Sequence, residues 1–175
     1  MSDQTRGVRV ALVTGTVGIG KSTIAYAVAE RAAARGVSAA FLDVDGLSRL
    51  WPAPAGDPFR SELILTNLRA IAGNYEAAGA ELLMLAWVIK DADDLTDLET
   101  AVGWPVTAVR LTASGAVVEA RLRNRHQGPE SNGLAWHLRR APELAASQDR
   151  GLRLPTIDAS GMVNEIADAV LDHLA

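Results

Sequence analysis

The sequence predicts an α/β fold, a three-layer αβα sandwich in which helices cover both faces of a parallel sheet of about five strands. Short apolar runs of Val, Leu, Ile and Ala alternate along the chain with longer segments that carry apolar residues at helical spacing. The runs contain few polar residues, which is typical of strands buried on both faces of a sheet. Strands that alternate with helices pair in parallel and leave helices on both faces, so these observations together predict the sandwich.

Each element is assigned from its apolar pattern and its boundaries. Gly36 ends the first helix, and three prolines and a glycine predict an irregular loop over residues 51–58. In chain order, the predicted strands are residues 8–13, 37–42, 81–89, 106–111 and 154–157. The predicted helices are residues 21–35, 58–79, 91–102, 114–126, a helix that follows the loop 128–133 and ends near residue 148, and 162–174.

Length and composition indicate one compact domain over residues 1–175. The net charge of −4 favours neither a nucleic acid nor an anionic membrane as a partner. Cysteine is absent, which excludes thiolate metal sites and cysteine nucleophiles. No apolar run reaches the roughly 18 residues of a membrane span, and the first residues lack the apolar core of a signal peptide. We therefore expect a cytoplasmic protein, either a monomer or a homodimer.

A glycine-rich motif joins the first strand to the first helix and matches G-x-x-x-x-G-K-[ST]. The motif is Gly15, Thr16, Val17, Gly18, Ile19, Gly20, Lys21 and Ser22. In this context the loop N–H groups and the helix N-terminus surround a phosphate, Lys21 reaches the β- and γ-phosphates, and the Ser22 hydroxyl binds Mg²⁺. Thr23 is expected near the α-phosphate. The motif therefore predicts binding of ATP with Mg²⁺.

Two large classes of proteins with such a loop are disfavoured by missing residues. GTPases need an N-K-x-D guanine reader, and the segment from Ile89 to Ala92 does not supply one. Motor-type ATPases usually carry an acidic residue at the end of an apolar strand, whereas the run 82–89 ends without one. Small kinases remain.

The second strand is followed by L-D-V-D-G-L-S-R, residues 42–49. This segment resembles the D-x-D region of shikimate, gluconate and adenylylsulfate kinases, and the chain is similar in length and layout to the chloramphenicol phosphotransferase type. The resemblance implies that one carboxylate supports the Mg²⁺ shell and the other orients or deprotonates the acceptor hydroxyl. Asp43 then supports Mg²⁺ and Asp45 is the base, with the reverse order left open. The alternative is a polar turn that caps a helix.

Arg121, Arg123 and Arg125 form a basic cluster late in the chain. Kinases of the group that the chain resembles, which have a nucleoside-monophosphate-kinase-like architecture, close an arginine-bearing lid over the nucleotide. The resemblance places that lid at about residues 113–133. Arg121 and Arg125 are four residues apart on one helix face and match the family pattern R-x-x-x-R, so these two are expected to reach phosphate. Arg123 is then solvated or paired with Glu119, and a solvated basic helix end is the alternative for the whole cluster.

The acceptor side carries weaker signals. Arg49 and Trp51 follow the D-x-D turn and are candidates for holding an anionic or planar acceptor, although Trp51 is equally suited to core packing. Lys90 follows the third strand and is either an acceptor contact or a surface residue. Residues 43–46 read D-V-D-G, where adenylylsulfate kinases have D-G-D-N. The third predicted strand also lacks the acidic residues that end this strand in chloramphenicol phosphotransferases. The resemblance therefore implies the type of reaction but does not identify the acceptor.

The last predicted strand leads into Asp158 and Ser160, where kinases of this group surround the adenine. Both are candidate nucleotide contacts, and Ser160 is equally suited to capping the final helix. His126, His137 and His173 have neither metal-ligand spacing nor catalytic neighbours and receive no role.

Together these motifs predict an ATP-dependent kinase that moves the γ-phosphoryl group to a hydroxyl of a small-molecule acceptor. One alternative is a nucleotide-binding regulatory switch that phosphorylates no metabolite. Another keeps the enzyme class and makes the acceptor a nucleotide or an antibiotic.

Overall fold

The computed structural model describes residues 7–126 and 133–174. Its strands are β1 (Arg9–Thr14), β2 (Ala39–Asp43), β3 (Leu82–Ala86), β4 (Val106–Thr112) and β5 (Thr156–Asp158). Its helices are α1 (Lys21–Ala34), the short 3-10 helix η1 (Val44–Ser48), α2 (Ser61–Ala77), α3 (Ala92–Val102), α4 (Gly115–Arg125), α5 (Leu134–Gly151) and α6 (Val163–Leu174).

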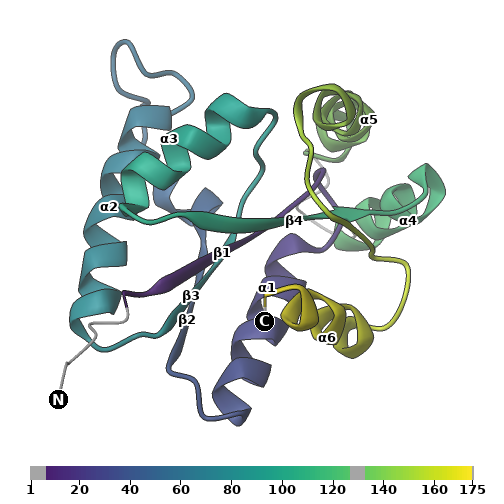
Figure 1. Ribbon diagram of the computed structural model, residues 1–175. Coiled ribbons are helices and arrows are strands. Elements are labelled where there is room, and N and C mark those ends of the chain that lie inside the picture. Colours follow the sequence, from purple (N-terminus) through teal and green to yellow (C-terminus); the bar gives the residue numbers. More distant parts are fainter. Residues whose placement is uncertain (1–6, 127–132, 175) are drawn as a thin grey trace, which may run out of the picture.

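The five strands form one sheet in the order β2-β3-β1-β4-β5, and every pair is parallel. Parallel pairing brings the carboxyl ends of all strands to one edge, and β1 lies in the middle of the sheet (Figure 1). From β1 the chain passes through α1 to the outer strand β2, returns to β3, and then crosses to β4 on the opposite side of β1. The end of β1 is therefore the switch point of the sheet, the usual ligand site in such folds.

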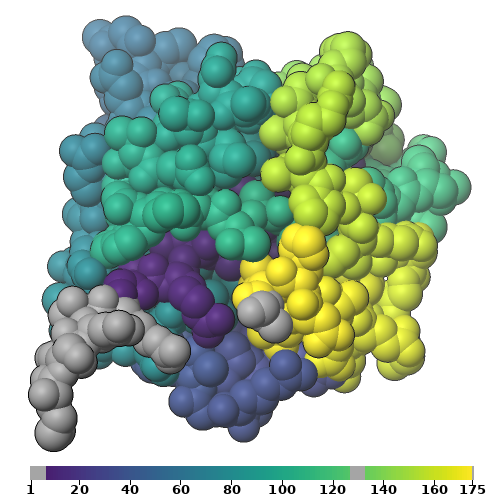
Figure 2. Space-filling model, viewed as in Figure 1, coloured from purple at the N-terminus to yellow at the C-terminus, as the bar shows by residue number. Residues whose placement is uncertain are grey.

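Two apolar cores lie on opposite faces of the sheet. Along β1, Ala11 and Val13 pack on the face covered by α1 and α6, while Val10 and Leu12 pack toward α2 and α3. Figure 1 shows the two helical layers on either side of the strands, and in Figure 2 the teal surface of α3 and the yellow surface of α6 lie on different sides of the molecule. The predicted α/β sandwich of five parallel strands is confirmed.

The apolar run that was predicted as one strand over residues 81–89 leaves the sheet after Ala86. Ile89 is nevertheless fully buried, because it packs in the core on the α2 and α3 face of the sheet. Its N–H donates to Thr14 Oγ1 at 3.1 Å and its carbonyl accepts from Gln148 Nε2 at 2.7 Å, so its backbone groups are paired outside the sheet. Burial in the core beyond the end of a strand therefore produces the same apolar pattern as a strand. The pattern alone does not separate the two environments.

The boundary of α2 also differs from the prediction, which began this helix at residue 58. The helix begins at Ser61, because the Asp57 carboxylate accepts from the N–H groups of Ser61 and Glu62 at 2.7 and 3.0 Å. Such capping of the first N–H groups fixes the start of a helix. Within residues 7–126 and 133–174, no helix combines the length and apolarity needed to cross a bilayer.

Candidate active site

A polar cleft of about 700 Å³ lies at the carboxyl edge of the sheet, around the end of β1. The phosphate loop, η1, the end of α4, the start of α5 and the loop after β5 form its walls. Its charged and titratable lining residues are Lys21, Asp43, Asp45, Arg49, Arg121, Arg125 and His137. A smaller hollow of about 380 Å³ lies at the opposite edge, with a mainly apolar lining that includes Trp104 and Leu171. The chemistry predicted from the sequence therefore gathers in the first cleft.

The phosphate loop has the backbone shape that its glycines predict. Gly15 and Gly18 have φ values of 143° and 79°, in the region that favours glycine. A Cβ on Gly15 would lie 2.8 Å from the Leu111 carbonyl oxygen, and one on Gly18 would lie 2.6 Å from Leu122 Cγ. The loop leads into α1, whose first turn has no acidic residue and no side-chain cap. The first N–H groups of α1 therefore have no intrahelical or capping partner, as an anion-binding helix end requires.

Lys21 lies at the bottom of this cleft with only 9% of its surface exposed. Its Nζ donates to the Thr16 carbonyl oxygen at 3.0 Å. Burial lowers the pKa of Lys21 from 10.5 to about 8, against the opposing charges of Asp45 and Asp43. The folded protein thus holds a poorly solvated ammonium group where anionic phosphate oxygens are expected.

This burial predicts a pH-dependent difference in stability between the protein and Lys21→Met. Because the folded-state pKa of about 8 lies below the unfolded value of 10.5, the folded protein binds fewer protons between these pH values and its stability rises with pH. The unfolding free energy of the parent protein should therefore rise by about 3 kcal/mol across this pH range, and that of Lys21→Met should lack this rise. Urea unfolding of both proteins at pH 7 and pH 10.5 measures it. Parallel pH dependence in the two proteins would contradict the burial of a charged Lys21.

Ser22 and the two aspartates face one another across the start of α1. Ser22 Oγ donates to Asp43 Oδ2 at 2.6 Å, and Asp43 Oδ1 accepts from the Asp45 N–H at 3.2 Å. Asp43 thus caps η1, as predicted by the alternative in which this segment is a polar turn that caps a helix. Asp43 also accepts a hydrogen bond from Ser22 of the phosphate loop. Asp45 is exposed to solvent at the cleft, and partial desolvation by the surrounding protein raises its pKa, while Lys21 opposes that effect.

The three arginines of α4 lie on two different faces of the helix, as their spacing predicts. Arg121 and Arg125 both line the cleft. Arg121 donates to the carbonyl oxygens of Ile19 at 2.8 Å and Ala159 at 2.6 Å, so it links α4 to the phosphate loop and to the loop after β5. Arg123 instead pairs with Glu119 at 2.7 Å on the exposed side of α4. The part of the predicted lid over residues 127–132 lies outside the described residues.

Six of the predicted site residues do not line the cleft: Gly15, Thr16, Trp51, Lys90, Asp158 and Ser160. Trp51 is 74% exposed and is not packed in the core. Lys90 Nζ pairs with Asp94 Oδ1 at 3.2 Å on α3. The exposed Asp158 carboxylate accepts from the Ser160 N–H at 3.0 Å. Hydrogen bonds from the Ser160 side chain and from this N–H lower the pKa of Asp158.

The loop after β5 instead contributes Ala159 and Gly161 to the cleft. Ser160 does not cap α6, which begins three residues later at Val163.

Among the described residues, no cluster of three or more His, Asp or Glu side chains is arranged to hold a metal ion by itself. The oxygen donors nearest the phosphate loop are Ser22 Oγ and the Asp43 carboxylate, 2.6 Å apart. Mg²⁺ in nucleotide sites is typically bound by one or two such groups together with phosphate oxygens.

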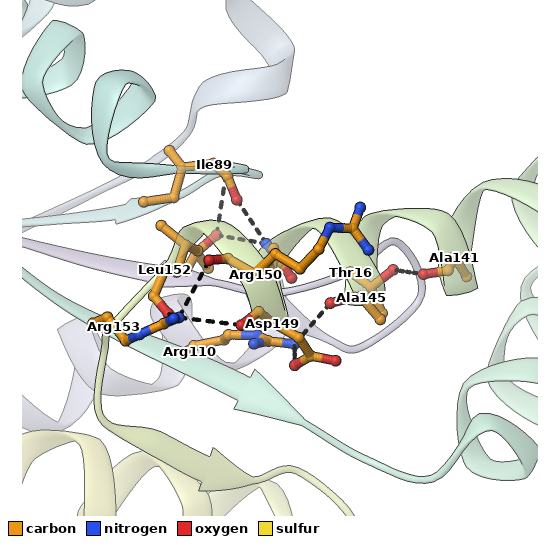
Figure 3. Close-up of polar contacts among 11 residues, drawn as sticks. Thr16, Ile89, Arg110, Ala141, Ala145, Asp149, Arg150, Leu152 and Arg153 are labelled. Atoms are coloured by element: carbon orange, nitrogen blue, oxygen red, sulfur yellow. Dashed lines mark hydrogen bonds and ion pairs between the residues drawn. The ribbon is translucent and has the colours of Figure 1, made fainter.

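A contact between the phosphate loop and α5 was not predicted. The Thr16 hydroxyl donates to the Ala141 carbonyl oxygen at 2.6 Å in a buried position, so this side chain faces α5 rather than the cleft (Figure 3). Arg110 on β4 adds a second link by donating to the Ala145 carbonyl oxygen and pairing with Asp149 at 2.8 Å. These contacts place His137, one turn before Ala141, in the cleft wall.

Thr16→Val tests how strongly the loop holds α5. The substitution keeps the shape of the side chain and removes its hydroxyl, so the unfolding free energy is expected to fall by about 1 kcal/mol. Urea unfolding measures the change, and Thr100→Val, at an exposed position on α3, is the matched control. Equal stability of Thr16→Val and the parent protein would show that the hydrogen bond contributes nothing net.

The parallel sheet and the phosphate loop at its carboxyl edge give the chain the fold of P-loop small-molecule kinases. No protein-family model matches the chain, and neither does any curated protein sequence. Solved structures do match. One is a tunicamycin resistance protein from Deinococcus radiodurans, with a TM-score of 0.65 and 21% identity, where the alignment covers 96% of each chain.

Two further solved structures that match are those of kinases. A gluconokinase from Sinorhizobium meliloti matches with a TM-score of 0.62 and 22% identity, over 95% of this chain and 91% of that one. The APS kinase of Mycobacterium tuberculosis, solved with AMPPNP and APS, matches with a TM-score of 0.61 and 21% identity, over 96% of this chain and 98% of that one. At these identities the likeness establishes the fold.

Proposed function

We propose that this protein is an ATP- and Mg²⁺-dependent kinase that transfers the γ-phosphoryl group to a hydroxyl of a small-molecule acceptor. The single observation that carries the proposal is the convergence of Lys21, Asp45 and Arg125 on one cleft at the uncapped N-terminus of α1. Phosphoryl transfer needs little covalent chemistry from a protein and depends on positioning and on charge neutralisation. A buried lysine, a carboxylate and lid arginines supply both.

The donor side of the cleft suits a nucleoside triphosphate. The glycines of the loop leave room for the phosphates, and the first N–H groups of α1 bind them. Lys21 contacts the β- and γ-phosphates in place of the Thr16 carbonyl oxygen that it now holds. Ser22 and Asp43 hold Mg²⁺, which when bound neutralises charge on the phosphate oxygens. Ala159 and Gly161 border the expected position of the base.

Asp45 is assigned to the acceptor hydroxyl. Asp43 is engaged through both carboxylate oxygens, one by Ser22 and one by the Asp45 N–H, whereas the Asp45 carboxyl faces the open cleft. The raised pKa of Asp45 makes its carboxylate a better proton acceptor near neutral pH. In the transfer, the acceptor oxygen bonds to the γ-phosphorus as the bond to the β,γ-bridging oxygen breaks. The hydroxyl proton passes to Asp45, and ADP leaves.

Arg49 is assigned to an anionic or strongly polar group of the acceptor. It lies one turn beyond Asp45 and lines the same cleft. Arg121 and Arg125 lie on the opposite wall, with Arg125 toward the transferring phosphoryl group. Trp51 and Lys90 stay candidates for the acceptor side only if the loops that carry them move toward the cleft when substrate binds.

The experiment that tests the proposal is a screen of small-molecule pools with γ-labelled ATP, comparing the protein with Lys21→Met. The pools should include gluconate, adenylylsulfate, shikimate and tunicamycin. These compounds are chosen because proteins of the same fold include a gluconokinase, an APS kinase, a shikimate kinase and a tunicamycin resistance protein. Label transfer that requires Lys21 supports the kinase. Tight ATP binding without transfer to any pool would instead support the regulatory switch, for which the absence of a carboxylate at the end of β3 is the motivating observation.

A further inference from the structure

The side chain of His137 lines the proposed nucleotide cleft and is held there by contacts with neighbouring residues. Its Nδ1 lies 2.8 Å from the Gly133 carbonyl oxygen, and a carbonyl oxygen only accepts, so Nδ1 carries a hydrogen. The ring packs against the edge of Trp136 and against His126, with ring centroids 5.0 and 4.9 Å apart. Its orientation is therefore set by three contacts, and Nε2 is the nitrogen left to meet a ligand.

The backbone that carries His137 is joined directly to the phosphate loop. His137 precedes Ala141 by four residues, so the two lie on one face of α5. The Ala141 carbonyl oxygen accepts from the Thr16 hydroxyl, and the Thr16 carbonyl oxygen accepts from Lys21 Nζ. His137 is thus positioned through the same loop that holds the phosphate-binding lysine.

The surroundings of His137 disfavour its protonation while the cleft holds no anion. Desolvation is the largest cause that lowers the pKa of His137, the hydrogen bond to Gly133 opposes it, and the charges of His126 and Arg125 at the end of α4 lower the pKa further. On α5 itself, Arg139 and Arg140 follow His137 in the sequence; Arg139 is exposed and Arg140 pairs with Glu143. The other charged groups that line the cleft with His137 are Lys21, Arg49, Arg121, Asp43 and Asp45. Positive groups outnumber negative ones in this set.

We propose that His137 is a nucleotide-contacting residue whose imidazole becomes protonated when the triphosphate binds and then donates from Nε2–H to a phosphate oxygen. The proposal rests on the proposed function, because it assigns the occupant of the cleft as a nucleoside triphosphate. Binding adds several negative charges beside the ring, which favours the charged imidazolium. The proton comes from solvent, and no covalent bond forms or breaks.

The sign of the pH dependence follows from the two states of the ring. In the free protein the pKa of His137 lies below 6.5, and in the complex the phosphate charge raises it. Between these values the complex binds one more proton than the free protein, so nucleotide affinity falls as the pH rises through that range. An increase of about one pKa unit corresponds to an affinity loss of about tenfold across the range.

The direct test follows the imidazole signals of the full-length protein by NMR from pH 5 to 8, with and without Mg²⁺ and the ATP analogue AMPPNP. The chain has three histidines, so His126→Asn, His137→Asn and His173→Asn assign the signals. The pKa of His137 is expected to rise by about one unit with AMPPNP, and the signals of the exposed His173 serve as the internal reference that AMPPNP does not move. An unchanged or lowered pKa of His137 in protein that binds AMPPNP would overturn this inference alone. Failure to bind AMPPNP would overturn the proposed function and this inference with it.

Two substitutions separate a phosphate contact from a structural role. Asparagine at 137 keeps a donor near the Nδ1 position for the Gly133 carbonyl oxygen but lacks Nε2, whereas glutamine places an uncharged donor near the Nε2 position. His137→Asn is expected to weaken AMPPNP binding about threefold to tenfold at pH 6 and to flatten its pH dependence. His137→Gln should recover part of the affinity without the pH dependence, and His173→Asn should match the parent protein. Lys21, Asp45 and the terminal phosphate also titrate, so the comparison is with the parent protein: a pH dependence as steep in both 137 variants as in the parent would contradict the contact.

Discussion

Lys21→Met is expected to reduce phosphoryl transfer by about 1000-fold or more, because the buried ammonium group neutralises charge that grows on the β- and γ-phosphate oxygens in the transition state. Lys21 is nearly inaccessible to solvent, and its Nζ is already held at the phosphate loop by the Thr16 carbonyl oxygen. No other lysine lines the cleft among the described residues. Water cannot replace the lost charge at so poorly hydrated a position.

The measurement is steady-state transfer of label from γ-labelled ATP to the acceptor found in the screen. Arg123→Ala is the matched control, because Arg123 pairs with Glu119 on the exposed side of α4. The control removes a cation from the lid helix without touching the cleft, and its activity should stay within about twofold of the parent. Retention of more than a tenth of the activity by Lys21→Met, with the folded state intact, would refute the phosphate role of Lys21.

Asp45→Asn is expected to lower kcat by about 100- to 10,000-fold while nucleotide affinity changes little, because general-base catalysis contributes rate enhancements of that size. The amide keeps the size of the side chain and cannot accept the acceptor proton. Asp43→Asn is expected to act differently, by raising the Mg²⁺ concentration that half-maximal activity requires, since Asp43 bonds the Ser22 hydroxyl.

The comparison of the two variants resolves the order of roles that the D-x-D motif left open. Transfer rates are measured over a Mg²⁺ titration, and ATP affinity is measured separately by calorimetry. Asp93→Asn on the exposed face of α3 controls for the loss of one negative charge. Full transfer by Asp45→Asn together with a large loss of kcat in Asp43→Asn, at saturating Mg²⁺, would reverse the assignment.

The features that sequence predicted well are local in the chain. The glycine spacing of the phosphate loop and the alternation of strands with helices depend on neighbouring residues, and both appear in the structure as expected. The spacing of Arg121, Arg123 and Arg125 likewise separates the two cleft-lining arginines from the paired one, because helical geometry is periodic. The predicted end of β3 was wrong because burial in the core beyond the strand and burial in the sheet leave the same apolar pattern.

The sequence by itself thus predicted most of the charged residues that gather in the cleft: the phosphate-loop lysine, two carboxylates after the second strand, and Arg121 and Arg125, all set by short-range spacing. Only the tertiary structure decided the rest of the cleft wall. His137 enters it because Thr16 bonds Ala141, 125 residues further along the chain, and Trp51 stays outside because its loop faces solvent. Contacts between distant segments depend on how whole helices pack on the sheet. No local pattern of residues records that packing.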